Sequence, residues 1–108
     1  MEYNYFDIHS HLNFSQFDAD RDAIIETMRR EHVGTITVGT GLVTSREAIA
    51  LAEKHEHLFA TIGIHPTDVE EVFDVGAFTQ LGQHKKIVAV GECGLDFFHK
   101  NDDDTKKR

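Results

Sequence analysis

Two histidines one residue apart follow an apolar stretch near the start of the chain, in FDIHSHL at residues 6–12. Alternate side chains of an extended strand point the same way, so the imidazoles of His9 and His11 can converge on one cation. Asp7 is predicted to lie on the same face, where it can act as the acceptor that orients an imidazole. This pattern predicts a metal site.

The same spacing recurs in HEH at residues 55–57. We expect a helix to end there, and residues two apart on a helix lie roughly 200° apart around its axis. Such a pair cannot converge on a cation as two histidines on a strand can. His55 and His57 are therefore predicted to be solvated residues at a helix end.

A further histidine stands where another apolar run ends, in GIHP at residues 63–66. A residue that precedes proline avoids helical geometry, so Pro66 is expected to hold His65 extended at the rim of a sheet. His65 is therefore a candidate for the same site. The alternative is a histidine that only bonds a neighbouring loop.

An acidic residue follows the apolar run IVAV, in GECGLD at residues 91–96. An unpaired carboxylate at Glu92 would carry a large desolvation cost there, which a cation can offset. Asp96 lies in the loop that follows. Two alternatives stay open: Glu92 can cap a helix or pair with a lysine, and Asp96 can simply turn the chain.

Four short β-rich runs must position these side chains, at residues 5–9, 34–40, 59–64 and 87–92. Three helices are predicted between them, the first capped by Asp18 or Asp20, the second starting from a capping box at residues 44–47 and the third beginning near Asp74. Alternating strands and helices predict a parallel sheet with right-handed crossovers, whose carboxyl edge binds ligands. The predicted fold class is α/β, with the candidate residues at that edge.

Composition narrows the function classes. The 108 residues suffice for one domain, and 19 acidic against 11 basic residues give a net charge of −8, which repels a polyanion unless a bound cation reverses the local field. Cys93 is the only cysteine, which excludes an internal disulfide and a thiol-rich metal site, and we expect it to be buried. No leader sequence and no apolar run of about 18 residues is present, so we expect a cytoplasmic protein without a membrane span.

In this order and at these separations, FDIHSHL, GIHP and GECGLD resemble the N-terminal signatures of the TatD family of metal-dependent hydrolases and deoxyribonucleases. The resemblance extends from residue 6 to about residue 104. His-x-His alone also occurs in amidohydrolases and in phosphoesterases of the polymerase-and-histidinol-phosphatase type, whereas GECGLD points to TatD. A small-molecule amidohydrolase on the same scaffold stays open as an alternative.

The resemblance implies a role for each candidate residue. His9, His11 and Glu92 would bind divalent metal ions (Mg²⁺, Mn²⁺ or Zn²⁺), and Glu92 would be a catalytic residue that bridges two of them. His65 would line the pocket for the substrate phosphate, and Asp96 would support substrate binding from the loop after the fourth strand. The implied reaction is hydrolysis of the phosphodiester backbone of DNA by an exonuclease.

The family fold is a TIM barrel of eight strands and about 250 residues, so residues 1–99 would form its N-terminal half. The charged segment 100–108 is expected to be a disordered tail. The remaining family ligands, two histidines and an aspartate, have no counterpart here. Self-association or a separate C-terminal half would be needed to complete the barrel. The alternatives are an inactive truncated fragment and a weak metal-binding module.

Overall fold

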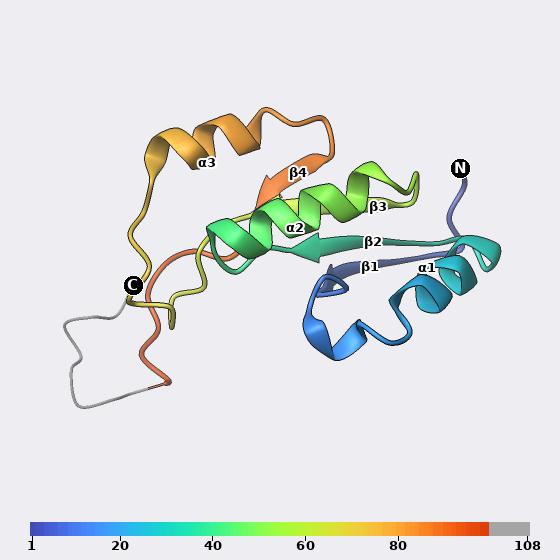
Figure 1. Cartoon of the computed structure of the whole chain (residues 1–108), viewed down its shortest axis with the longest axis horizontal. Helices are drawn as coiled ribbons and strands as arrows, with labels where there is room; N and C mark the ends of the chain where they lie inside the picture. The colour runs from blue at the N-terminus through green and yellow to red at the C-terminus, as the bar shows by residue number, and fades with distance from the viewer. Residues whose placement is uncertain (100–108) are drawn as a thin grey trace.

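The computed structural model describes residues 1–99 of the chain. Its strands form one parallel sheet in chain order: β1 (Tyr5–Ser10), β2 (Val33–Val38), β3 (Leu58–Ile62) and β4 (Ile87–Val90). The connecting helices are α1 (Arg21–Arg30), α2 (Leu42–Glu53) and α3 (Val75–Gly82), and a short 3₁₀ helix, η1 (Ser15–Phe17), precedes α1 (Figure 1). The predicted α/β class is confirmed, and the tail predicted at residues 100–108 lies outside the described residues.

The core lies between the sheet and its helices. Side chains alternate along β3, so Leu58, Ala60 and Ile62 share the face that meets the helices. They pack against small and branched residues of α2 and an aromatic residue of α3, namely Ala48, Ile49, Ala52 and Phe78. No helix within residues 1–99 is long and apolar enough to cross a membrane.

The start of α2 differs from the capping box predicted at residues 44–47. The helix begins at Leu42, so Thr44 lies within its first turn, where the hydroxyl accepts the Gly41 N–H at 2.9 Å. The Glu71 carboxylate accepts the Leu42 N–H, also at 2.9 Å. Glu71 is 29 positions further along the chain, so a long-range contact helps to set where α2 begins.

The other two helices start close to the predicted positions. Asp74 accepts the Ala77 N–H at 3.0 Å and caps α3 as predicted. Asp20 occupies the position before α1, but its side chain makes no capping hydrogen bond. Asp18 pairs instead with the Arg21 guanidinium at 2.8 Å. The predicted aspartate cap of α1 is therefore replaced by an ion pair.

The prediction of two solvated histidines at residues 55–57 is wrong. His57 is only 1% exposed, and its Nε2 lies 3.1 Å from the Ile25 carbonyl oxygen of α1. His55 is half-buried. The turn that leads from α2 into β3 packs against α1, where the N–H of the buried imidazole finds a backbone carbonyl as its acceptor.

The two outer strands have open edges. Side chains of β1 and β4 are largely exposed, among them Tyr5 (75%), Ile8 (74%) and Val90 (67%). Parallel strands are normally covered on both faces, and a closed TIM barrel has eight of them. The described sheet is the N-terminal half of such a barrel, open along β1 and β4.

Candidate metal centre

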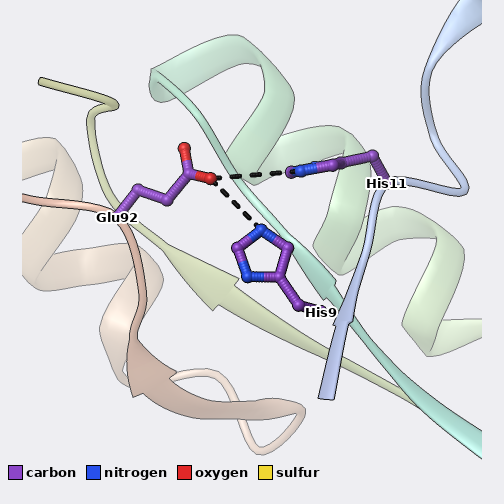
Figure 2. Close-up of side chains that lie close together, drawn as sticks. All are labelled: His9, His11 and Glu92. Carbon is purple, nitrogen blue, oxygen red and sulfur yellow. Dashed lines mark ion pairs between the residues drawn. The ribbon is translucent and has the colours of Figure 1, made fainter. Parts of the chain in front are cut away.

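His9, His11 and Glu92 come together at the carboxyl edge of the sheet, as Figure 2 shows. His9 lies in β1, His11 directly follows it, and Glu92 is two residues after β4. Glu92 Oε1 lies 3.3 Å from His9 Nε2 and 4.0 Å from His11 Nε2. One ligand atom from each residue lies within 4.8 Å of the other two. Because β1 and β4 are opposite edges of the sheet, its curvature must bring these side chains together.

The Glu92 carboxylate fits a divalent cation. Its side chain is 13% exposed, and within residues 1–99 its ion-pair partners are the two histidines. Its other oxygen, Oε2, is buried without a hydrogen-bond partner. A buried carboxylate oxygen left unpaired is costly, and a cation held together with the two imidazoles would compensate that cost. The alternative in which Glu92 pairs with a lysine does not occur in the described residues.

The His11 imidazole is fixed on two sides. Its Nδ1 lies 2.9 Å from the Val38 carbonyl oxygen, which can only accept, so Nδ1 carries a hydrogen, and in the neutral ring Nε2 presents its lone pair toward Glu92. The Phe14 ring stacks on the imidazole with centroids 4.5 Å apart and an interplanar angle of 15°. Sequence reasoning missed both contacts. Val38 acts through its backbone, which no motif marks, and only the closeness of Phe14 to His11 in the chain could have suggested the stack.

His9 is less constrained than His11. Its side chain is 56% exposed, and its ring lies edge-on to the His11 ring with centroids 5.1 Å apart. The prediction that Asp7 orients an imidazole is wrong, because its Oδ1 accepts the backbone N–H of His9 at 2.9 Å. The pairing of β1 with β2 shifts register between Asp7 and Ser10, so simple alternation does not hold there.

Close backbone packing fixes where Glu92 leaves the sheet. The Ile64 N–H donates to the Glu92 carbonyl oxygen at 2.9 Å, and a Cβ on Gly63 would overlap that oxygen. A Cβ on Gly91 would likewise overlap the Thr61 hydroxyl. Glycine at both positions therefore permits β3 and β4 to meet directly below the carboxylate.

His65 lies in the segment that follows β3 and does not join the three-residue group. Its backbone N–H donates to the Thr40 carbonyl oxygen at 2.9 Å, and its side chain is half-buried. The ring Nδ1 accepts the Thr67 N–H at 3.1 Å and lies 2.6 Å from the Thr67 hydroxyl. A neutral His65 with Nδ1 as acceptor carries its hydrogen on Nε2.

Asp96 also lies outside the group, because its carboxylate is occupied within its own loop. It accepts the N–H groups of Phe98 and His99 at 2.8 and 3.1 Å, and the His99 ring Nδ1 lies 2.6 Å away. Desolvation raises the pKa of Asp96, but the hydrogen bonds from His99 and Phe98 outweigh it, so the net pKa lies below its ordinary value. The carboxylate therefore rigidifies the loop after β4.

Cys93 is exposed, so the prediction that it is buried is wrong. It follows the last strand of the described sheet, where no further element covers it. Beside it lies an apolar hollow of about 600 Å³ between α3 and β4, lined by residues that include Phe73, Phe78, Val90 and Glu92. Of the three grouped residues, Glu92 lines this hollow, whereas His9 and His11 do not.

The sequence is similar to two groups of known proteins. It is 47% identical over 96 residues to the 3′-5′ ssDNA/RNA exonuclease TatD of Musicola paradisiaca (strain Ech703), a match that covers 85% of this chain and 36% of that protein. It is 38% identical over 95 residues to an uncharacterized metal-dependent hydrolase, YabD, of Bacillus subtilis (strain 168), covering 85% of this chain and 37% of that protein. The chain therefore spans little more than a third of the length of these relatives.

The fold is similar to that of a solved structure, the TatD homologue YJJV from Escherichia coli K12. The TM-score is 0.78 with 33% sequence identity, over 94% of this chain and 40% of that one. A sequence model of the family described as TatD related DNase matches residues 6–108. The motifs, the strand order and these matches agree: the chain belongs to the TatD family.

Proposed function

We propose that this chain supplies the metal-binding edge of a nuclease that hydrolyses phosphodiester bonds in DNA, acting as an exonuclease. The observation that carries the proposal is the buried, unpaired Oε2 of Glu92 beside the Nε2 atoms of His9 and His11. The names of the relatives support the substrate class, and they extend it to RNA. Mixed histidine and carboxylate ligands suit Zn²⁺ or Mn²⁺ at least as well as Mg²⁺.

His9, His11 and Glu92 would hold the divalent ions, and the two oxygens of the Glu92 carboxylate are suited to bridge a pair. When bound, such ions polarise a phosphoryl group and lower the pKa of a coordinated water. The protein contributes three ligand atoms held within 4.8 Å and a fixed tautomer of His11. Because the net charge of −8 repels nucleic acid, positive charge concentrated at one edge is what would allow a single phosphate to bind.

His65 and Asp96 are proposed to act on the substrate side. Because Thr67 occupies Nδ1 of His65, the ring can donate its Nε2 hydrogen to a phosphate oxygen. Asp96 would support substrate binding indirectly, since its carboxylate holds the loop that follows Glu92. In this proposal His65 contacts the phosphate, and Asp96 keeps one wall of the site in place.

The open edges of β1 and β4 support a proposal about assembly. An exposed strand edge readily pairs with another chain. A second copy of this chain, or a separate C-terminal half, would pair with both edges and enclose the centre. Light scattering across a range of concentrations separates the two, since a dimer supports the second copy and a monomer at every concentration excludes it.

Nucleotide release from a 3′-labelled single-stranded DNA in Mn²⁺ tests the function. The assay compares the chain, Glu92→Gln and a matched control, Glu56→Gln, which changes an exposed carboxylate between His55 and His57. We expect release that requires Mn²⁺ and disappears only in Glu92→Gln. If the chain releases nothing, alone or with a C-terminal half of a relative added, the proposal fails for this chain.

A metal-binding module without turnover is the second candidate. It is favoured by the number of ligands, because the described residues supply three and leave the His9 side chain 56% exposed. Calorimetry that detects Mn²⁺ binding without nucleotide release would support it. An inactive fragment that folds poorly would instead show no cooperative thermal transition.

A further inference from the structure

A single arginine ties together the segment between β1 and α1. Arg21, the first residue of α1, donates from Nε to the Leu12 carbonyl oxygen at 2.5 Å and from Nη2 to the Phe14 carbonyl oxygen at 2.7 Å. The same Nη2 donates to the Asp18 carboxylate at 2.8 Å. The Arg21 side chain is 21% exposed, so these bonds are partly shielded from water.

The carbonyls that Arg21 holds belong to the turn that carries His11. The Phe14 N–H donates to the His11 carbonyl oxygen at 3.0 Å, which closes the turn. Leu12 points into the core at 5% exposure. The Phe14 ring is thereby laid on the His11 imidazole, at the 4.5 Å separation given above.

We propose that Arg21 is a positioning residue for the metal centre, acting through Phe14 on the His11 imidazole. This inference rests on the proposed function of His11 as a ligand. Phe14 blocks one face of the ring while the Val38 carbonyl holds Nδ1, so rotation of the ring would break both contacts. Together they keep Nε2 directed at Glu92.

The chemistry of the guanidinium suits this role. Three oxygen acceptors lie around it, and its planar fork presents several donors in fixed directions. A lysine ammonium at the same place is a compact point charge whose donors rotate on a flexible stem, so it does not fix the directions of the bonds to the two carbonyls as the guanidinium does. Arg21→Lys therefore keeps the charge but loosens the turn.

Arg29 of the same helix provides a matched control. It pairs with Glu26 on the exposed side of α1, at 2.6 Å, and both side chains are about half exposed. Arg29→Lys makes the same chemical change in the same helix without touching the turn. Neither variant changes the net charge, and a general effect of replacing arginine by lysine in α1 would appear in both.

The test uses two measurements on the full chain. Long-range ¹H–¹⁵N NMR of the imidazole rings at about pH 8, without metal, reports the His11 tautomer when the ring is neutral. Calorimetry with Mn²⁺ reports metal affinity. In the wild type we expect the tautomer with the hydrogen on Nδ1. In Arg21→Lys we expect a mixture of tautomers and an Mn²⁺ affinity roughly 10- to 100-fold lower, the usual effect of losing support around a metal ligand.

The outcomes separate the inference from the proposed function. A folded Arg21→Lys variant with the wild-type tautomer and affinity overturns the inference and leaves the metal centre intact. A wild type that binds no Mn²⁺ overturns the metal centre and the role of Arg21 with it. If Arg21→Lys fails to fold, Phe14→Leu decides, because it leaves the carbonyl bonds in place and removes only the stacked ring. An unchanged tautomer in Phe14→Leu overturns the inference.

Discussion

Two His-x-His segments of this chain share spacing and ring geometry but differ in their surroundings. The first pair, His9 and His11, has ring centroids 5.1 Å apart at an angle of 77°, and the second pair, His55 and His57, has values of 5.9 Å and 75°. The first pair faces the Glu92 carboxylate, whereas in the second pair His57 bonds a backbone carbonyl. The distance between two rings therefore does not define a metal site.

The neighbours of the second pair explain its different role. A cation already lies beside it, because Lys86 Nζ donates to the carbonyl oxygens of His55, Glu56 and Leu58 at 3.0, 3.2 and 2.9 Å. The second pair also precedes β3, at the amino edge of the sheet, whereas the first pair lies at the carboxyl edge. The edge of the sheet and the sign of the neighbouring charge therefore distinguish the pair that we propose as metal ligands from the second pair.

Removing the Glu92 carboxylate should have the largest effect on the difference between the two histidine pairs. In Glu92→Gln we expect Mn²⁺ affinity to fall by more than roughly 100-fold, because the neutral amide replaces the charged ligand. Calorimetry measures the loss, with Glu56→Gln as the control beside the second pair. Equal affinities in the two variants would mean that Glu92 is not a ligand.

Replacing one histidine of each pair by alanine tests whether only the first pair binds a metal. We expect His11→Ala to weaken Mn²⁺ binding by roughly 10- to 100-fold and His55→Ala to change it by less than about twofold. The same calorimetric titration measures both variants. A comparable loss in both would show that the second pair also binds the metal.

The second pair should instead matter for stability. His57→Ala removes a buried side chain together with its hydrogen bond to the Ile25 carbonyl, so we expect a loss of about 2 to 3 kcal/mol in the free energy of unfolding. Thermal denaturation should show a Tm lower by roughly 10 °C. His9→Ala, at an exposed position, is the matched control, and an equal Tm in both variants would refute the structural role of His57.

The smallest expected effect is a pH dependence at His55. Burial, followed by the positive charge of protonated His57, lowers the pKa of His55 below its ordinary 6.5. The unfolded chain then binds the proton more readily than the folded one, so this group costs stability as the pH falls below about 6.5. We expect the Tm to drop less in His55→Gln than in the wild type between about pH 7.5 and pH 5.5. An equal drop in Tm in the two proteins would exclude a contribution of His55 to the pH dependence of stability.

The sheet and the first pair could be predicted because they depend on local pattern and one general rule. Short runs rich in β-branched residues give the strands, and parallel strands bring their carboxyl ends to one edge. Glu92 and the first pair therefore meet as expected. The prediction left out the two contacts that hold the His11 ring in place. The Val38 carbonyl and the Phe14 ring contact it in the folded chain, and residue spacing does not reveal such contacts.

The wrong prediction for His57 and the shifted start of α2 share a cause, which is that a distant segment decides the local outcome. His57 is buried because α1 offers a carbonyl 32 positions away. The start of α2 depends on Glu71, and the local sequence around Thr44 fits either start. The proposed roles of His65 and Asp96 came from the resemblance, and the structure places both outside the group formed by His9, His11 and Glu92.

The contact between Gly63 and the Glu92 carbonyl makes the centre vulnerable at a position that binds nothing. An added methyl group at residue 63 would have to push β3 and β4 apart or move the backbone that carries Glu92. If His9, His11 and Glu92 hold a metal ion as proposed, one small substitution at residue 63 can abolish metal binding while all three side chains remain. Among natural variants of this chain, we therefore expect a residue other than glycine at 63 to accompany loss of the proposed centre, even where the two histidines and the glutamate are intact.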